Sequence, residues 1–193
     1  VADTYYIGQL GTEALAGLAL VFPMVMLLQM TSAGAMGGGV SSAVARALGA
    51  GNRDAARNLV VHGLVIGVSG GLVFTLLLLV FGRGLYRLLG GQGAPLEQAL
   101  AYSAVLFGGA VLVWLFNSLA AVIRGTGNMA LPAWVTCVGV AILIPVSPAL
   151  IFGWGPFPAL GIAGGAVALV SYYAAGTAVL AAYLWSGKAV VRP

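Results

Sequence analysis

Long apolar stretches separated by short runs of Gly, Pro and charged residues dominate this sequence. They cover about residues 13–48, 55–81, 96–123, 131–152 and 161–185. A helix needs about 20 mostly apolar residues to cross the hydrocarbon core of a bilayer, so each stretch is long enough to span it. Residues 1–11 resemble the second half of one more such helix, which ends at the Gln9–Gly11 break. The sequence therefore predicts an all-α, polytopic transmembrane helix bundle with one half-helix and five full spans.

The composition excludes an ordinary water-soluble domain. The chain is 61% hydrophobic and 6% charged, whereas a soluble domain carries about 25% charged residues. Its net charge of +4 comes from basic residues scattered between apolar runs, which indicates membrane topology signals rather than a nucleic-acid surface. The one cysteine, Cys137, cannot form an internal disulfide or a thiol metal cluster, and we expect neither a metal nor a cofactor.

Small residues recur at every fourth position in two places. One set contains Gly34 and Gly38, and the other contains Gly63, Gly67 and Gly71. In lipid, this spacing lets two helix backbones approach closely. We therefore expect all five glycines to lie at helix–helix contacts.

The first full span, residues 13–48, is longer than a straight crossing requires. We expect it either to tilt strongly or to project from the membrane at one end. Thr12 is a candidate N-cap for this helix, and Pro23 lies early enough in it to produce a kink.

The basic residues predict the orientation of the spans. Loops that follow the second, fourth and sixth segments carry most of them: Arg46, Arg53, Arg57, Arg124, Lys188 and Arg192. The opposite side carries Arg83 and Arg87, which we place in a loop that ends at Pro95. Because Lys and Arg are enriched in cytoplasmic loops, the 46–57 loop, the 124–130 loop and the C-terminus are predicted to be cytoplasmic.

Several of these stretches resemble one known family. They read VADTYYIGQLGTEALAGLAL, FPMV, GGGVSSAVARALGAGNRDAARN, RGTGNMALPAW and PALIFGWGPFPALGIAGGAVA. In order and loop spacing they are similar to the N-terminal half of a multidrug and toxic compound extrusion (MATE) transporter. The resemblance implies a twelve-helix exporter of two six-helix lobes in a bacterial inner membrane. Residues 1–193 would form its N-terminal lobe, truncated at the start of helix 1.

The same resemblance implies the partners of the chain. They are the lipid bilayer, a small drug-like substrate, a C-terminal lobe that this sequence lacks, and a transported coupling ion, H⁺ or Na⁺. Nucleic acid is not among them.

Asp3 is the strongest candidate for cation coupling. It lies about two helical turns before the Gly8–Gly11 break, which places it roughly 10 Å inside the membrane at 1.5 Å per residue. A carboxylate at that depth is costly unless it is protonated, paired or bound to a cation. The alternative is a water-exposed helix end. The resemblance favours coupling, because the family carries its coupling acid here, and the hydroxyl of Thr4 is a further candidate ligand.

Asn117 is the second candidate, in the middle of residues 96–123. An amide in lipid needs a partner, and interhelical hydrogen bonding is its common use. Contact with the cation or the substrate is an equal alternative, and the resemblance favours it because family members carry Asn at about this place. Gln29 and Thr31 are weaker candidates for the substrate cavity.

The fifth segment departs from the family pattern. Many members have Gly-Asn-x-x-Asn-x-x-x-Asp-Pro where this chain has Val140, Leu143 and Ser147 in place of the two amides and the acid. A Na⁺ site with two carboxylates therefore does not fit this segment, which shifts the expectation modestly towards H⁺. Ser147 remains a candidate for the substrate cavity, and carbonyl groups freed by Pro145 and Pro148 could line it.

The function favoured by these residues is cation-coupled antiport that exports lipophilic or cationic small molecules. A lipid-linked oligosaccharide flippase of the same superfamily is an alternative, although it would need a more cationic cavity. A non-transporting membrane subunit is another alternative. A membrane-embedded enzyme is excluded, because the apolar segments hold no convergent nucleophile, acid and base.

Overall fold

The computed structural model describes residues 2–154, 158–186 and 189, apart from the side chains of residues 2 and 3. The described residues form α-helices and one π-helix, which confirms the all-α prediction. In chain order these are α1 (Ala2–Gly8), α2 (Thr12–Gln29), the π-helix η1 (Met30–Met36), α3 (Gly37–Gly49), α4 (Arg53–Leu88), α5 (Gly93–Gly108), α6 (Ala110–Gly125), α7 (Ala130–Phe152) and α8 (Ile162–Trp185).

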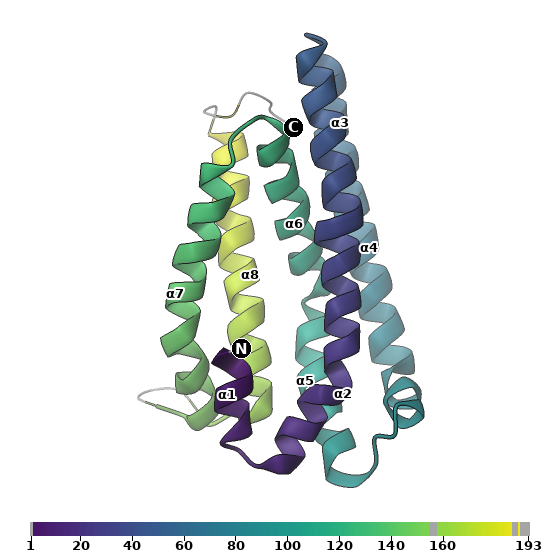
Figure 1. Ribbon diagram of the computed structural model, residues 1–193, viewed down its shortest axis with the longest axis vertical. Helices are drawn as coiled ribbons and strands as arrows, with labels where there is room; N and C mark the ends of the chain where they lie inside the picture. Colours follow the sequence, from purple (N-terminus) through teal and green to yellow (C-terminus); the bar gives the residue numbers. More distant parts are fainter. Residues whose placement is uncertain (1, 155–157, 187–188, 190–193) are drawn as a thin grey trace.

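The helices match the predicted spans closely. Four continuous runs are long and apolar enough to cross a membrane: Thr12–Gly49, Arg53–Leu88, Ala130–Phe152 and Ile162–Trp185. The bent pair α5 and α6 makes a fifth span when counted as one. Successive spans run in opposite directions, so the connections gather at two ends of the bundle (Figure 1).

The first span is one helical run with a π-helical turn inside it. Gly11 is the N-cap of α2 and no side chain caps the helix, so the predicted Thr12 cap is wrong. The helix continues through Pro23, and its irregular turn comes later, at η1. Figure 1 shows α3 and the start of α4 extending beyond α6, α7 and α8 at the same end of the bundle, which agrees with a projecting helix.

Hydroxyl groups explain why the π-turn begins at Met30. Thr31 Oγ1 donates to the carbonyl oxygen of Leu27 at 2.7 Å, and Ser32 Oγ donates to that of Leu28 at 2.6 Å. These are the carbonyls that the backbone N–H groups of residues 31 and 32 would use in an α-helix. Competition of this kind loosens a helix locally, and π-turns are often found at functional sites.

Glycines set the contact between α4 and the neighbouring helices. Gly63, Gly67 and Gly71 are buried, and a Cβ on Gly71 would lie 2.4 Å from the Cα of Val111 on α6. Gly34 and Gly38 differ: a Cβ on either would have no described atom within 4 Å. Within the described part of the chain, these two glycines do not make the predicted helix contact.

The span predicted over residues 96–123 is broken in the middle. Helices α5 and α6 meet at Gly109 with a bend of 47°. A Cβ on Gly109 would lie 2.7 Å from Val170 Cγ1, so glycine permits the close approach of α8. The carbonyl oxygen of Phe107, in the last turn of α5, accepts a hydrogen bond of 2.6 Å from Thr75 Oγ1. This bond from α4 adds to the backbone N–H bond that the same carbonyl accepts at the C-terminal cap of α5.

Helix α4 is longer than predicted. It continues to Leu88, so Arg83 and Arg87 lie on its last turns and not in a loop. Arg83 Nη2 lies 3.1 Å from Glu97 Oε1 on α5, and both side chains are largely exposed. An exposed pair of this kind contributes at most about 1 kcal/mol.

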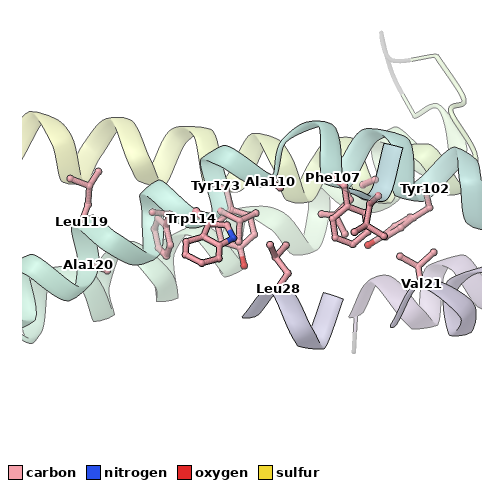
Figure 2. Packing of buried hydrophobic residues seen from close by; sticks show 14 of the residues in the cluster. Val21, Leu28, Tyr102, Phe107, Ala110, Trp114, Leu119, Ala120 and Tyr173 are labelled. Carbon is pink, nitrogen blue, oxygen red and sulfur yellow. The ribbon is translucent and has the colours of Figure 1, made fainter. Parts of the chain in front are cut away.

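Helix α6 lies at the centre of the bundle, and most of its residues are buried. Figure 2 shows Trp114, Leu119 and Ala120 of this helix among core residues from α2, α5 and α8. The core is therefore built around the second half of the bent span.

Substitution of Gly71 by Ala should destabilise the bundle, because the new methyl group meets the backbone of Val111. Overpacking of this kind costs about 1–3 kcal/mol. Gly38→Ala is the matched control, since its methyl group points into open space and alanine favours a helix. Thermal unfolding in detergent measures both variants, and equal midpoints would contradict the contact.

Candidate functional site

Four polar side chains from three spans meet in the core. Asn117 Nδ2 on α6 donates to Ser32 Oγ on η1 at 2.9 Å and lies 3.5 Å from Gln29 Oε1 on α2. Gln29 Nε2 donates in turn to the hydroxyl of Tyr173 on α8. We call Gln29, Ser32, Asn117 and Tyr173 the polar cluster.

The polar cluster is largely closed off from the surroundings. Ser32 is 1% exposed, and Asn117 and Tyr173 are each 8% exposed, while Gln29 is half-buried. Polar groups without hydrogen-bond partners are costly in a bilayer. Each of these four side chains has a hydrogen-bond partner. The structure thus brings together Asn117 and Gln29, which the sequence predicts separately.

Thr31 does not join the cluster. Its hydroxyl donates to the carbonyl oxygens of Leu27 and Leu28 in its own helix. Its role in the described structure is therefore local to the π-turn.

Of the coupling residues predicted in the first helix, the structure describes Thr4 and the backbone of Asp3. The backbone of Asp3 lies in α1, which packs against α2, α7 and α8, but its side chain lies outside the described residues. Thr4 is exposed. Ile7, one turn further on, is fully buried and lies opposite Gly165 of α8, which anchors the helix to the bundle.

The fifth predicted segment forms the continuous helix α7, which runs through both Pro145 and Pro148. Ser147 is fully buried in it. The two amide positions of the family pattern hold Val140 and Leu143, and Leu143 faces a groove between α7 and α8.

This groove has a volume of about 480 Å³. Its larger lining side chains come from Trp134, Val138, Ile142, Leu143 and Val146 on α7 and from Tyr172 and Val179 on α8. None of its described lining residues is charged. The groove therefore suits an apolar occupant, and none of Gln29, Thr31 and Ser147 lines it.

Three aromatic rings contact one another where the groove adjoins the polar cluster. The ring of Phe116 lies 5.8 Å from that of Tyr172 and 5.4 Å from that of Tyr173. The two tyrosine rings are 4.9 Å apart, edge to face. Tyr172 belongs to the groove and Tyr173 to the cluster, so the two features are neighbours.

Two members of the cluster, Ser32 and Tyr173, are not among the site residues predicted from the sequence. Ser32 follows Gln29 by three residues, a spacing that puts both side chains on one helix face, and this signal could have found it. Tyr173 has no comparable signal, because its partner Gln29 is 144 residues away. Among the described residues, no group of three His, Cys, Asp or Glu could hold a metal ion.

A bundle of long apolar spans with a buried polar cluster beside an apolar groove defines a polytopic integral membrane protein. A family model described as MatE matches residues 1–149. The chain belongs to this family, as the sequence motifs predict. Members of the family are transporters and not enzymes, which supports the exclusion of an enzyme.

Relatives and solved structures agree with this membership. The chain is 34% identical over 168 residues to an FAD transporter of Shewanella oneidensis. That match covers 87% of this chain and 37% of the relative. It is 31% identical over 179 residues to the probable multidrug resistance protein YoeA of Bacillus subtilis, covering 93% of this chain and 38% of the relative.

Among solved structures, the chain matches a crystal structure of MATE in the bent conformation with a TM-score of 0.92 and 30% identity. That match covers 99% of this chain and 42% of the other. An inward-facing conformation of a multidrug resistance MATE family transporter matches with the same TM-score and covers 42% of that chain. The chain therefore spans about two fifths of the length of its relatives.

A double-mutant cycle on Asn117→Ala and Ser32→Ala should give a coupling free energy of about 0.6 kcal/mol. This is the average for hydrogen bonds between membrane helices, and about 1.7 kcal/mol is the upper end. Reversible unfolding in mixed detergent micelles measures it. The control cycle pairs Asn117→Ala with Thr31→Ala, whose hydroxyl bonds only its own helix, and it should be additive. Additivity in the first cycle would contradict the interhelical bond.

Proposed function

We propose that this chain is the N-terminal lobe of a cation-driven exporter of lipophilic small molecules. The observation that carries the proposal is the buried polar cluster next to an apolar groove, in a chain that matches the MatE family over residues 1–149. The lobe would work with a second lobe in the complete polypeptide, since relatives are more than twice as long.

Asp3 is the proposed coupling acid. It stands in a helix that packs against α2 and α7, and a carboxylate in a membrane-spanning segment is a functional group by default. The coupling ion is H⁺ or Na⁺, with Thr4 and Asn117 as further polar groups. The aliphatic residues Val140 and Leu143 remove amide ligands that Na⁺ would use, which favours H⁺.

The groove determines the proposed substrate class. A lipophilic molecule, cationic or neutral, would place its apolar part against Tyr172 and Leu143, and an aromatic face also attracts organic cations. The similarity to the FAD transporter of Shewanella oneidensis suggests a dinucleotide as the alternative substrate. Its phosphates would need Arg or Lys, which the described lining of the groove lacks. The same lack disfavours an oligosaccharide flippase.

The proposed location is the bacterial inner membrane with the α3–α4 and α6–α7 connections in the cytoplasm. These connections lie at the same end of the bundle (Figure 1). Arg46 and Arg53 flank one of them and Arg124 precedes the other, and this excess of basic residues supports the orientation.

Asp3→Asn in the complete polypeptide should reduce gradient-driven efflux at least tenfold, because the neutral amide cannot exchange a proton or offset a cation's charge. Drug accumulation in cells measures the effect at matched expression. Asp54→Asn is the control, since Asp54 lies in the exposed first turn of α4, and it should transport normally. Normal efflux by Asp3→Asn would refute the coupling role.

The orientation predicts which cysteines are reachable from outside the cell. In a Cys137→Ala background, Gln92→Cys should react with a membrane-impermeant maleimide in intact cells. Ala50→Cys and Met129→Cys should react only after permeabilisation. All three positions are exposed, so the pattern reports the side of the membrane, and the reverse pattern would overturn the assignment.

A further inference from the structure

The groove between α7 and α8 opens away from the rest of the bundle. Its described lining comes from these two helices alone, which lie at one edge of the bundle in Figure 1. On α7, Ile142 lines the groove, whereas Ile151, nine residues later, packs near Ile7 of α1. On α8, Ala175 lines the groove, whereas Thr177 donates to a carbonyl oxygen of α6. At about 100° per residue, the lining residue and the inward residue of each helix point in nearly opposite directions.

A difference in side-chain size between the two helices forms the groove. Helix α8 contributes Ala168, Ser171 and Ala175 to the lining, and their spacing of three and four residues puts these small side chains on one helix face. Helix α7 contributes the larger Val138 and Ile142. The space of about 480 Å³ therefore lies over the small face of α8 and beside the larger side chains of α7.

The length of the groove corresponds to one leaflet of a bilayer. Its lining residues on α7 extend from Trp134 to Val146, which is about 18 Å along the helix at 1.5 Å per residue. One half of the hydrocarbon core is about 15 Å thick. Trp134 lies in the second turn of α7 and is 68% exposed, and tryptophan is enriched at the membrane–water interface. The groove thus begins at one interface and ends shortly beyond the bilayer centre.

We propose that the groove binds one acyl chain of an inner-leaflet phospholipid, with the ester end of the chain at Trp134 and its methyl end at Val146. An acyl chain is apolar and unbranched, which suits a long groove whose described lining has no charged residue. Since a lipid tail is already in an apolar environment, the hydrophobic effect adds little to its binding. The attraction comes from van der Waals contacts with both helices, which a concave surface increases in number.

Two parts of this inference rest on the proposed function. The assignment to the inner leaflet uses the proposed orientation, in which the α6–α7 connection is cytoplasmic. A lipophilic substrate that enters the groove from the bilayer has to displace the acyl chain, so the lipid and the substrate compete. The binding of a chain to the groove depends on neither part.

Photolabelling of the complete polypeptide in phosphatidylglycerol liposomes tests the site. Two phosphatidylglycerol probes carry a diazirine in one acyl chain, either near the ester or near the methyl end. The first probe should label α7 around Trp134, and the second should label it around Val146. The methyl-end probe should label Val146 at least threefold more than Leu72 and Leu76, which lie on the exposed apolar face of α4.

Ala175→Leu should lower the labelling of the groove at least threefold, because the larger side chain fills the space over α8. Ala178→Leu is the matched control: it makes the same change at an exposed alanine of α8 that does not line the groove, and it should leave the labelling unchanged. Ser171→Leu is a second variant that fills the groove. All three positions are exposed, so the variants should fold, which thermal unfolding in detergent checks.

Equal labelling of the groove and of the exposed face of α4 would reduce the site to ordinary boundary lipid and overturn the proposal. Lack of labelling in the groove would mean that another part of the polypeptide covers it, with the same consequence. Full labelling in Ala175→Leu and Ser171→Leu would also contradict the site. The reverse order of the two probes along α7 would place the chain in the outer leaflet and overturn the leaflet assignment.

Tetraphenylphosphonium, a lipophilic cation, tests the competition. Its addition should lower the labelling of the groove at least threefold, which would connect the lipid site with transport. Unchanged labelling in a polypeptide that exports this cation would refute the displacement of lipid by substrate. Failure of the exporter proposal would appear separately, as efflux that does not depend on Asp3, because the photolabelling needs no transport.

Discussion

The structure depends on one constraint, which is that polar groups inside a bilayer must find their partners within the protein. The chain meets it with bonds that cross between helices. Thr75 and Thr177 donate to the carbonyls of Phe107 and Leu112 on either side of the bend between α5 and α6, and Tyr86 donates to Ser103 between α4 and α5 at 2.7 Å. Among the described residues, the buried polar atom without a partner is Nε1 of Trp114, whose ring packs against Gly70 and Phe74. The bonds of the threonines and of Tyr86 join α4 to α5 and α8 to α6.

Sequence reasoning predicted the fold well wherever the signal is a sum over many residues. A run of about 20 apolar residues can hardly be anything but a span, and all five full spans were found in this way. It failed where one or two residues determine the local backbone geometry. The bend at Gly109 depends on Val170 approaching from α8, and the π-turn depends on hydroxyl groups that also bond outside their own helix. Helix α4 runs past its apolar part because Arg83 and Arg87 can extend towards water from a helix.

The candidate site was also predicted only in part: the sequence indicates some of its residues but not their contacts. Asn117 and Gln29 stand out in the sequence because amides are rare and costly in lipid. Their direct contact does not follow from the sequence, since it requires the relative rotation of α2 and α6, which their packing sets. The glycines show the same limit. All five share a spacing of four, but Gly63, Gly67 and Gly71 are buried while Gly34 and Gly38 are open. Spacing places residues on one face of a helix and does not say what covers that face.

The distribution of polar and apolar side chains differs between two parts of the described structure. The fifth segment has Val140 and Leu143 where many family members have amides, and Leu143 lines the groove. The side chains of the polar cluster lie instead on α2, η1, α6 and α8, beside the rings of Phe116 and Tyr172. Tyr172 lines the groove, and its ring contacts that of Tyr173, which accepts a hydrogen bond from Gln29. Aromatic packing therefore connects the groove with the cluster, and the cluster in turn contains Ser32 of the π-turn.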